Sequence, residues 1–257
     1  LGLGCLVGVC LFVASEAAAG PVRFLATDGT KLYRTDSDGN VEPTLSLSAA
    51  VQSLTFVPGG FALPGASGGD VIACAHSATG GRYALYRVYD PFGVAPTLTQ
   101  IGSTAIGVGS LVFANGGIYA VEDSQNPVRV YRLDPTTLNS VENWSTGISA
   151  GGGGGMAYDP EGDRFLLTDL QANRLMSLTV GSAATAIGPV GFGFSNNGME
   201  FLDGTLYGAL RPDSPGNELR MGSYDLTTGA FTTLATVTGV SGGGTGFVAI
   251  PAPAACT

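Results

Sequence analysis

Three aspartates at the ends of similar short segments are the residues best placed to do chemistry. Asp28, Asp123 and Asp169 each close an apolar segment of the same kind. If these segments are equivalent strands of one repeat, their ends share a face, and the three carboxylates converge there. Carboxylates in a partly dehydrated space repel one another, and a bound cation relieves that repulsion. Because oxygen ligands are available and nitrogen or thiolate ligands are nearly absent, the sequence predicts calcium there in preference to zinc.

Further polar residues fall in the loops of the same face, where we expect them to contact a ligand. They are His76, Glu122, Asn196, Asn197, Arg211 and Asp213. The intervening loops are almost free of side chains, as in GISAGGGGG from Gly147, VGFGFSNN from Val190 and GVSGGGTG from Gly239. Backbone amides and carbonyls would therefore line much of this face, which we predict to be the binding face.

Turn capping is the alternative explanation for each of these acids taken singly. Asp28 precedes Gly29 in a tight-turn dipeptide, and the residues after Asp123 and Asp169 suit bonds from a side chain to the backbone,. For the acids predicted at the opposite face, in DSDG, DPFG, DPTT and DLTTG, we expect a structural role only. These are Asp36, Asp38, Asp90, Asp134 and Asp225.

Catalytic motifs are weak in this chain. His76 is the only histidine, and no Gly-x-Ser-x-Gly element accompanies it, so neither a Ser-His-Asp triad nor a multi-histidine metal site is predicted,. The glycine run that ends at Gly155 lacks the Lys-Ser/Thr pair of a phosphate-binding loop,.

A fivefold repeat carries all of these residues. Its first strands are SLTFVPGG from Ser53, SLVFANGG from Ser110, GMAYDPEG from Gly155, GMEFLDG from Gly198 and GFVAIP from Gly246. Its third strands are centred on Tyr33, Tyr86, Tyr131, Met176 and Met221, about 45 to 53 residues apart,. This spacing is typical of one four-stranded blade, and it predicts an all-β, five-bladed β-propeller in which the five central residues are buried at equivalent positions.

The order of the strands predicts how the ring closes. The chain opens on a second-type strand and ends on a first-type strand, so 246–251 should complete the blade formed by 22–47. The other blades should span 53–102, 110–146, 155–190 and 198–237. Such a closure joins the two ends and removes an exposed sheet edge. We expect the insertion at 61–69 to be a surface loop.

Composition limits the partners. The net charge is −9, and only 12% of the residues are charged. A nucleic-acid or anionic-membrane partner requires a basic face, so neither is predicted.

The N-terminal 19 residues are predicted to be a secretion signal, because an apolar run precedes an Ala-x-Ala pattern ending at Ala19,. With no initiator Met and no basic segment before that run, we expect the reading frame to begin upstream. The propeller would then occupy 20–251, with a tail at 252–257 and no membrane span in the mature chain. In the mature chain we expect Cys74 to be a buried thiol and Cys256 to lie in the tail. The sequence does not decide whether the two form a disulfide.

The repeated strands, with their Gly turns and LYRLDPTT-like third strands, resemble NHL and YVTN repeat propellers of secreted bacterial proteins. Five-bladed members of this superfold include glycoside hydrolases and carbohydrate-binding lectins. This resemblance implies that Asp28, Asp123 and Asp169 could act as hydrolase carboxylates. It also implies that Glu122, Asp169 and Asn196 or Asn197 could serve a calcium-dependent lactonase. The end, IPAPAACT from Ile250, resembles the start of a PEP-CTERM sorting signal.

We expect an exported, non-enzymatic propeller that binds an extracellular small molecule, carbohydrate or protein on its loop-rich face. An enzyme that uses carboxylates at the channel mouth is one alternative. A structural protein of the cell surface or extracellular matrix is the other.

Overall fold

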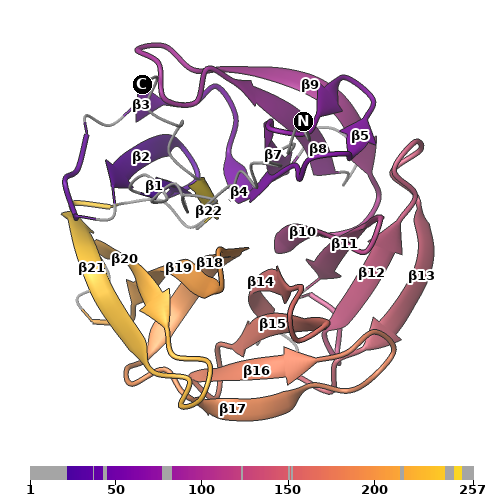
Figure 1. The fold of residues 1–257 in the computed structure, drawn as a ribbon, viewed down its shortest axis with the longest axis vertical. Coiled ribbons are helices and arrows are strands. Elements are labelled where there is room, and N and C mark those ends of the chain that lie inside the picture. The colour runs from indigo at the N-terminus through magenta and orange to yellow at the C-terminus, as the bar shows by residue number, and fades with distance from the viewer. Residues whose placement is uncertain are drawn as a thin grey trace, which may run out of the picture.

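The computed structural model describes residues 22–36, 38–42, 45–76, 83–122, 124–149, 151, 153–214, 217–240 and 246–250; of residues 36, 153 and 196 it describes only the backbone. All elements assigned in these ranges are β-strands. Five four-stranded sheets surround a central axis (Figure 1), which confirms the predicted all-β, five-bladed β-propeller. The described part contains no helix long and apolar enough to cross a membrane.

The blades follow one pattern, in which four strands succeed one another from the axis outward. The first blade is β22 (Phe247–Ile250), β1 (Arg23–Thr27), β2 (Lys31–Asp36) and β3 (Leu45–Ser46). The second is β4 (Val51–Phe56), β7 (Val71–His76), β8 (Tyr83–Tyr89) and β9 (Thr97–Thr104). The third is β10 (Ser110–Ala114), β11 (Gly117–Glu122), β12 (Arg129–Leu133) and β13 (Ser140–Ser145). The fourth is β14 (Gly153–Asp159), β15 (Arg164–Asp169), β16 (Arg174–Leu178) and β17 (Thr185–Pro189). The fifth is β18 (Phe194–Leu202), β19 (Thr205–Pro212), β20 (Glu218–Tyr224) and β21 (Phe231–Thr238).

The closure of the ring is as predicted. Strand β22 pairs antiparallel with β1, from Arg23 opposite Ile250 to Ala26 opposite Phe247. On its two sides β22 contacts the innermost strands β18 and β4. The last described strand of the chain therefore completes the first blade and the ring together.

The centres of the third strands are equivalent, as predicted. Each lies opposite a second-strand residue, and in four of the five blades that residue is alanine. The pairs are Tyr33 with Ala26, Tyr86 with Ala73, Tyr131 with Ala120, Met176 with Leu167 and Met221 with Ala209. Tyr33, Met176 and Met221 are buried, whereas Tyr86 and Tyr131 are half-buried; none of the five is exposed, so the predicted strand phase is confirmed,.

The innermost strands approach one another closely. A Cβ on Gly246 would lie 2.7 Å from the backbone N of Leu54. Elsewhere in the ring, hydroxyl groups bridge the gap: the backbone N of Leu111 donates to Ser53 Oγ at 3.1 Å, and that of Met156 donates to Ser110 Oγ at 3.1 Å. The small residues that begin the first strands are therefore what allows five strands to meet around a narrow channel.

The insertion at 61–69 is more ordered than the predicted loop. It contains a small hairpin of β5 (Ala62–Leu63) and β6 (Ala66–Ser67). Phe61, which precedes the hairpin, packs edge to face on Phe113 of the third blade, with ring centroids 5.1 Å apart. The insertion thus covers part of one end of the ring.

Candidate functional site

A cavity of about 510 Å³ opens where four of the five innermost strands end. It lies at the end of the ring that holds the turns 57–70, 115–116, 160–163 and 203–204, which we call the turn face. The other end, with the predicted site residues, we call the loop face. The cavity is lined by the ends of β4, β10, β14 and β18 and by the turns that follow them.

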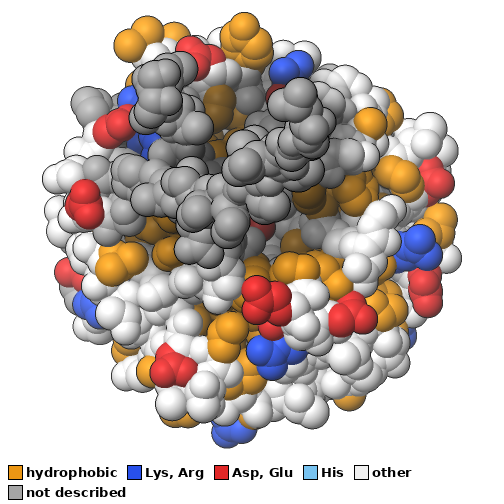
Figure 2. Space-filling model, viewed as in Figure 1, with side chains coloured by type: hydrophobic (Ala, Val, Ile, Leu, Met, Phe, Trp, Pro, Cys, Tyr) orange, Lys and Arg blue, Asp and Glu red, His pale blue; other side chains and the backbone are white. Residues whose placement is uncertain are grey.

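Aromatic side chains at one repeat position surround this cavity. Phe56, Phe113, Tyr158 and Phe201 each stand three residues after a small residue at one repeat position of the first strand, and all four line the cavity. The small residues are Ser53, Ser110, Gly155 and Gly198. Pro58, Phe61, Pro160 and Leu202 extend this apolar wall. Figure 2 shows one face of the ring, where charged side chains are few and scattered and hydrophobic ones reach the central hollow.

Glu200 is the only residue with a charged side chain among the described residues that line the cavity. In the repeat it occupies the position that Thr55, Val112, Ala157 and Val248 hold in the other blades. Its carboxylate spans the channel from β18 to β4, where the backbone N of Phe56 donates to Oε2 at 3.4 Å. Along β18, which runs toward the turn face, Glu200 is the lining residue furthest from the mouth.

Burial among apolar side chains raises the pKa of Glu200 to about 8, although the backbone N–H groups of Phe56 and Phe201 act to lower it. A carboxyl group with this pKa carries its proton through most of the neutral range. It can donate a hydrogen bond in that form, and it can ionise when a cation arrives.

A hydrogen-bonded cluster that includes the Asp163 carboxylate forms the rim of the cavity on the side of β10 and β14; the bonds from Tyr158 and Asn115 lower the pKa of Asp163. The Tyr158 hydroxyl lies 2.7 Å from Asp163 Oδ1 and 2.8 Å from Asn115 Oδ1, and Asn115 Nδ2 donates to Asp163 Oδ1 at 3.0 Å. Burial and the bond to Asp163 raise the pKa of Tyr158 to about 12, so its hydroxyl keeps its proton at neutral pH. The mouth thus presents the Asp163 carboxylate, held by Tyr158 and Asn115, at its rim and Glu200 at its inner end.

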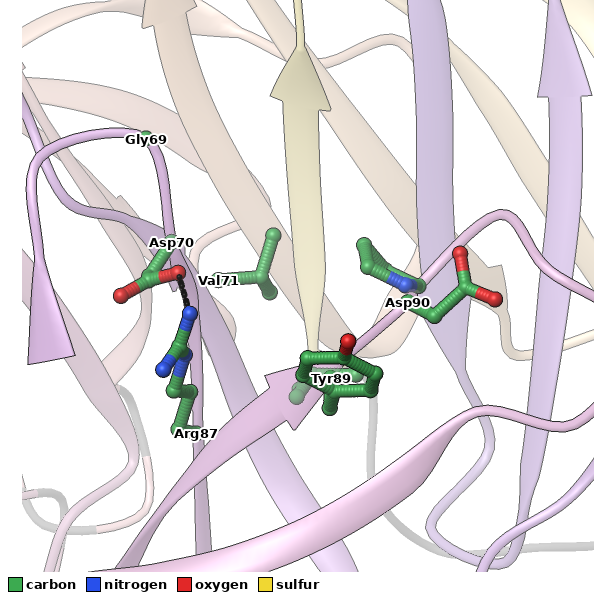
Figure 3. A pocket seen from close by; sticks show the side chains of 8 residues that line it. Gly69, Asp70, Val71, Arg87, Tyr89 and Asp90 are labelled. Carbon is green, nitrogen blue, oxygen red and sulfur yellow. Dashed lines mark ion pairs between the residues drawn. The ribbon is translucent and has the colours of Figure 1, made fainter. Parts of the chain in front are cut away.

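A second cavity, of about 320 Å³, lies toward the outside of the second blade. It is lined by Gly69 to Val71 and by Arg87 to Pro91. Figure 3 shows that Arg87 points toward Asp70, with which it forms an ion pair of 2.8 Å, whereas the Tyr89 ring stands apart. Three charged residues line this cavity, Asp70, Arg87 and Asp90, and its one base is already paired with Asp70, so we prefer the first cavity as the candidate site.

Two of the three aspartates predicted to bind metal serve as turn caps. Asp28 is 1% exposed; its Oδ1 accepts from the backbone N of Thr30 at 3.1 Å and of Lys31 at 2.9 Å, and its Oδ2 accepts from Tyr33 Oη at 2.7 Å. Asp169 accepts from the backbone N of Gln171 and of Ala172, both at 3.1 Å. Asp123 lies outside the described residues. Within the described ranges no three His, Cys, Asp or Glu side chains are grouped so as to hold a metal.

The residues predicted to contact a ligand are spread over the loop face. His76 is exposed and stacks edge to face on Tyr83. Glu122 accepts hydrogen bonds from Ser124 of its own loop and from the backbone N of Gly107, which precedes β10. Asp213 is exposed. The side chain of Asn196 lies outside the described residues.

Asn197 joins two blades instead of facing a cavity. It is 2% exposed; its Oδ1 accepts from the backbone N of Gly155 at 2.7 Å and from Thr168 Oγ1 at 2.8 Å. Its Nδ2 donates to Tyr224 Oη at 3.4 Å. These bonds hold β18 against the fourth blade.

One predicted site residue, Arg211, acts electrostatically on Tyr33, which another, Asp28, contacts. The charge of Arg211, on the fifth blade, acts to lower the pKa of Tyr33, on the first. Burial and the bond to Asp28 nevertheless raise that pKa overall. Asp28 and Tyr33 are therefore joined by a hydrogen bond within the first blade, and Arg211 acts on Tyr33 electrostatically from the fifth.

The cavity on the turn face was not predicted from the sequence, although the sequence contains a signal for it. Aligning the five first strands puts a glutamate in a column of Thr, Val, Ala and Val, next to a column that is aromatic in four of the five strands. Ionisable residues are seldom buried, so packing of the core alone does not explain a glutamate at a repeat position where the other blades carry mostly apolar residues.

The chain matches no protein-family model and no curated protein. Solved structures resemble it at low identity. One is a nidogen/laminin complex, 11% identical over 88% of this chain and 98% of that chain, with a TM-score of 0.49. Another is a putative 6-phosphogluconolactonase from Bacteroides uniformis, 14% identical over 85% of this chain and 68% of that one, with a TM-score of 0.42.

A third similar structure is virginiamycin B lyase from Staphylococcus aureus, 12% identical over 75% of this chain, with a TM-score of 0.40. The present chain spans 59% of the length of that lyase. At these identities and TM-scores, the similarities bear on neither the ligand nor the activity of this protein.

Proposed function

We propose that this protein is a binding propeller that takes a small amphipathic molecule into the cavity of the turn face. The observation that carries the proposal is the ring of Phe56, Phe113, Tyr158 and Phe201 around a cavity with one acid at its inner end. Cavities that bind small molecules are concave and mostly apolar, with a few placed polar groups that fix orientation. At about 510 Å³ this one falls in the usual range for such sites,.

We place this binding in an exported protein, because residues 1–19 have the pattern of a secretion signal,. The ligand would then be an extracellular small molecule or the apolar part of a larger partner, such as a modified carbohydrate or a protein side chain. The measurement is the N-terminal sequence of protein recovered from the culture medium. A mature chain that begins near Gly20 supports export, and an uncleaved intracellular protein contradicts it.

Catalysis is a second candidate, favoured by the raised pKa of Glu200. A carboxylic acid with a pKa near neutrality suits proton transfer. Binding is nevertheless the better explanation, because the described lining residues offer no second acid or nucleophile close to Glu200. A calcium site of the loop face that includes Asp123 stays a separate proposal. It predicts that calcium raises the melting temperature of the parent and not of a variant with Asn at Asp28, Asp123 and Asp169.

The binding proposal is tested by filling the cavity from its rim. Gly59 lines the cavity, and a Cβ added to it meets no atom within 4 Å, so Gly59→Trp can place a large side chain there without disturbing the backbone. Titrated with the neutral dye Nile red, the parent should show saturable fluorescence, and Gly59→Trp should bind at least about tenfold more weakly.

Val180→Trp is the matched control, because Val180 is 48% exposed and lies in the turn between β16 and β17, away from the cavity. It should bind the dye as the parent does. Equal binding by the parent and Gly59→Trp would remove the cavity from the proposal, as would a parent that shows no saturable binding.

A further inference from the structure

Resting on the proposed function, we propose that the cavity selects a lipophilic monocation, an aryl or alkyl amine whose ammonium group pairs with Glu200 while its apolar body lies among the four aromatic side chains. Both the geometry of the cavity and the charges around it point to this chemical class of ligand.

The geometry sets one end of the ligand. Glu200 lies at the inner end of the cavity, and its carboxylate reaches across the channel to the backbone N of Phe56. An ammonium group that enters ahead of its apolar body meets this carboxylate first. The apolar body then occupies the space between Phe113, Tyr158 and Phe201, whose ring faces also attract a cation on its way in,.

The charges near Glu200 favour a cation. The strands that contact β18 are β4, β14, β19 and β22. Strands β4 and β22 contain no ionisable side chain. Strand β14 contributes Tyr158 and, at its end, Asp159. Strand β19 contributes Tyr207, which lies opposite Glu200, and also Arg211, which lies nearer the loop face. The turn after β14 brings the Asp163 carboxylate to the rim through its bond with Tyr158, Arg211 acts on Tyr33, and no basic side chain lines the cavity among the described residues. With no basic partner of its own in the cavity, and in a chain of net charge −9, Glu200 gains a counter-ion only from the ligand.

An amine and a neutral ligand differ in what they do to the proton of Glu200. Because burial raises the pKa of this carboxyl to about 8, the empty site is mostly protonated at pH 7. An ammonium ion stabilises the carboxylate, so its binding releases a proton to the solvent. Its affinity should rise up to about tenfold for each pH unit between about 6 and 8. A neutral alcohol accepts a hydrogen bond from the protonated acid and releases nothing.

The test compares phenethylamine with phenethyl alcohol, which share an apolar body and differ in the terminal group. Isothermal titration at pH 7.5 should give the amine the lower Kd by at least about tenfold in the parent. Titrations in phosphate and in Tris should give different apparent enthalpies for the amine, from which the number of protons released is obtained, and the same enthalpy for the alcohol.

Glu200→Gln should bind the alcohol within about threefold of the parent and lose the preference for the amine, because it keeps the shape and hydrogen-bonding capacity of the side chain and removes its charge. Glu142→Gln, which removes a charge from an exposed position of β13, is the matched control and should keep the preference.

The possible outcomes distinguish a cation site from a cavity without charge selection. If alcohol and amine bind equally, or if Glu200→Gln keeps the preference for the amine, the cavity binds small molecules without selecting cations. The proposed function then holds, and only the selection of a monocation is contradicted. If neither probe binds the parent, the proposed function fails with it.

Discussion

At the scale of single residues, the cavity depends on one glutamate placed where the other blades carry Thr, Val, Ala and Val. A carboxyl group in such a position gives up solvation that the backbone N–H groups of Phe56, at 3.4 Å, and of Phe201 only partly replace,. Folding therefore favours the protonated acid, and the stability of the protein is linked to the pH.

The linkage has a definite sign. The ordinary pKa of a glutamate is 4.5, and burial raises that of Glu200 to about 8, so between these values the folded state holds a proton that the unfolded state has released. Stability should fall as the pH rises through this window, by about 1.4 kcal/mol per pH unit, and level off above it. Glu200→Gln should remove this fall.

Urea unfolding of the parent and of Glu200→Gln at several pH values from about 5 to 9 measures the effect. The acids whose pKa is lowered, Asp134, Asp159, Asp163 and Asp225, lose their contribution only toward lower pH and do not interfere in this range. The control Glu142→Gln should follow the parent. If the parent and Glu200→Gln keep a constant difference across the range, Glu200 is ionised in the folded protein.

At the scale of strands and turns, a good part of the structure could be predicted from the sequence. The alternation of side chains and the repeat length fix which residues share a face, and so Tyr33, Tyr86, Tyr131, Met176 and Met221 lie at equivalent positions. The predicted caps at Asp134 and Asp225 are also present, each accepting two backbone N–H bonds. Such bonds depend on residues two or three positions apart, which a sequence shows directly.

The cavity could not be predicted in the same way, because contacts between distant segments form it. Phe61 and Phe113 meet because the insertion of the second blade folds over the third. Glu200 and Phe56 meet although they are 144 residues apart. The glycine-rich loops favoured the loop face as the predicted site, but several of the polar residues there prove to be engaged with their own backbone or with neighbouring blades.

The innermost strands offer a prediction at this scale. A Cβ on Gly246 would lie 2.7 Å from the backbone N of Leu54 and 2.8 Å from the backbone C of Ser53, and backbone atoms cannot rotate away as the end of a side chain can. Gly246→Ala should therefore destabilise the protein by about 1 to 3 kcal/mol. Gly59→Ala, where the new Cβ meets no atom within 4 Å, should change stability by less than about 0.5 kcal/mol or increase it slightly,. Equal melting temperatures for the two variants would contradict the close approach of β22 and β4.

At the scale of the whole molecule, the first blade and the second hold each other through more than the ring of inner strands. Arg34 Nη1 donates to the backbone O of Gly93 at 2.7 Å, and the Arg23 guanidinium lies 3.6 Å from the centre of the Phe92 ring. Both contacts join the blade that contains the two ends of the propeller to the turn between β8 and β9. The closing blade is thus fixed at its outer part as well as at the axis.

Closure of the ring by β22 makes the last prediction. Removal of 246–257 takes away Phe247, Val248 and Ala249, which are at most 1% exposed, and leaves an edge of β1 unpaired. The junctions with the first, second and fifth blades all lose core contacts, so we expect a loss of several kcal/mol, enough to unfold a marginally stable domain. Removal of 251–257 alone keeps β22, and that protein should melt within a few degrees of the parent, as followed by circular dichroism. The two truncated proteins differ only in residues 246–250. If both lose their structure, the stability comes from the tail at 251–257. If both keep it, four complete blades and the three remaining strands of the first blade form a closed ring without β22.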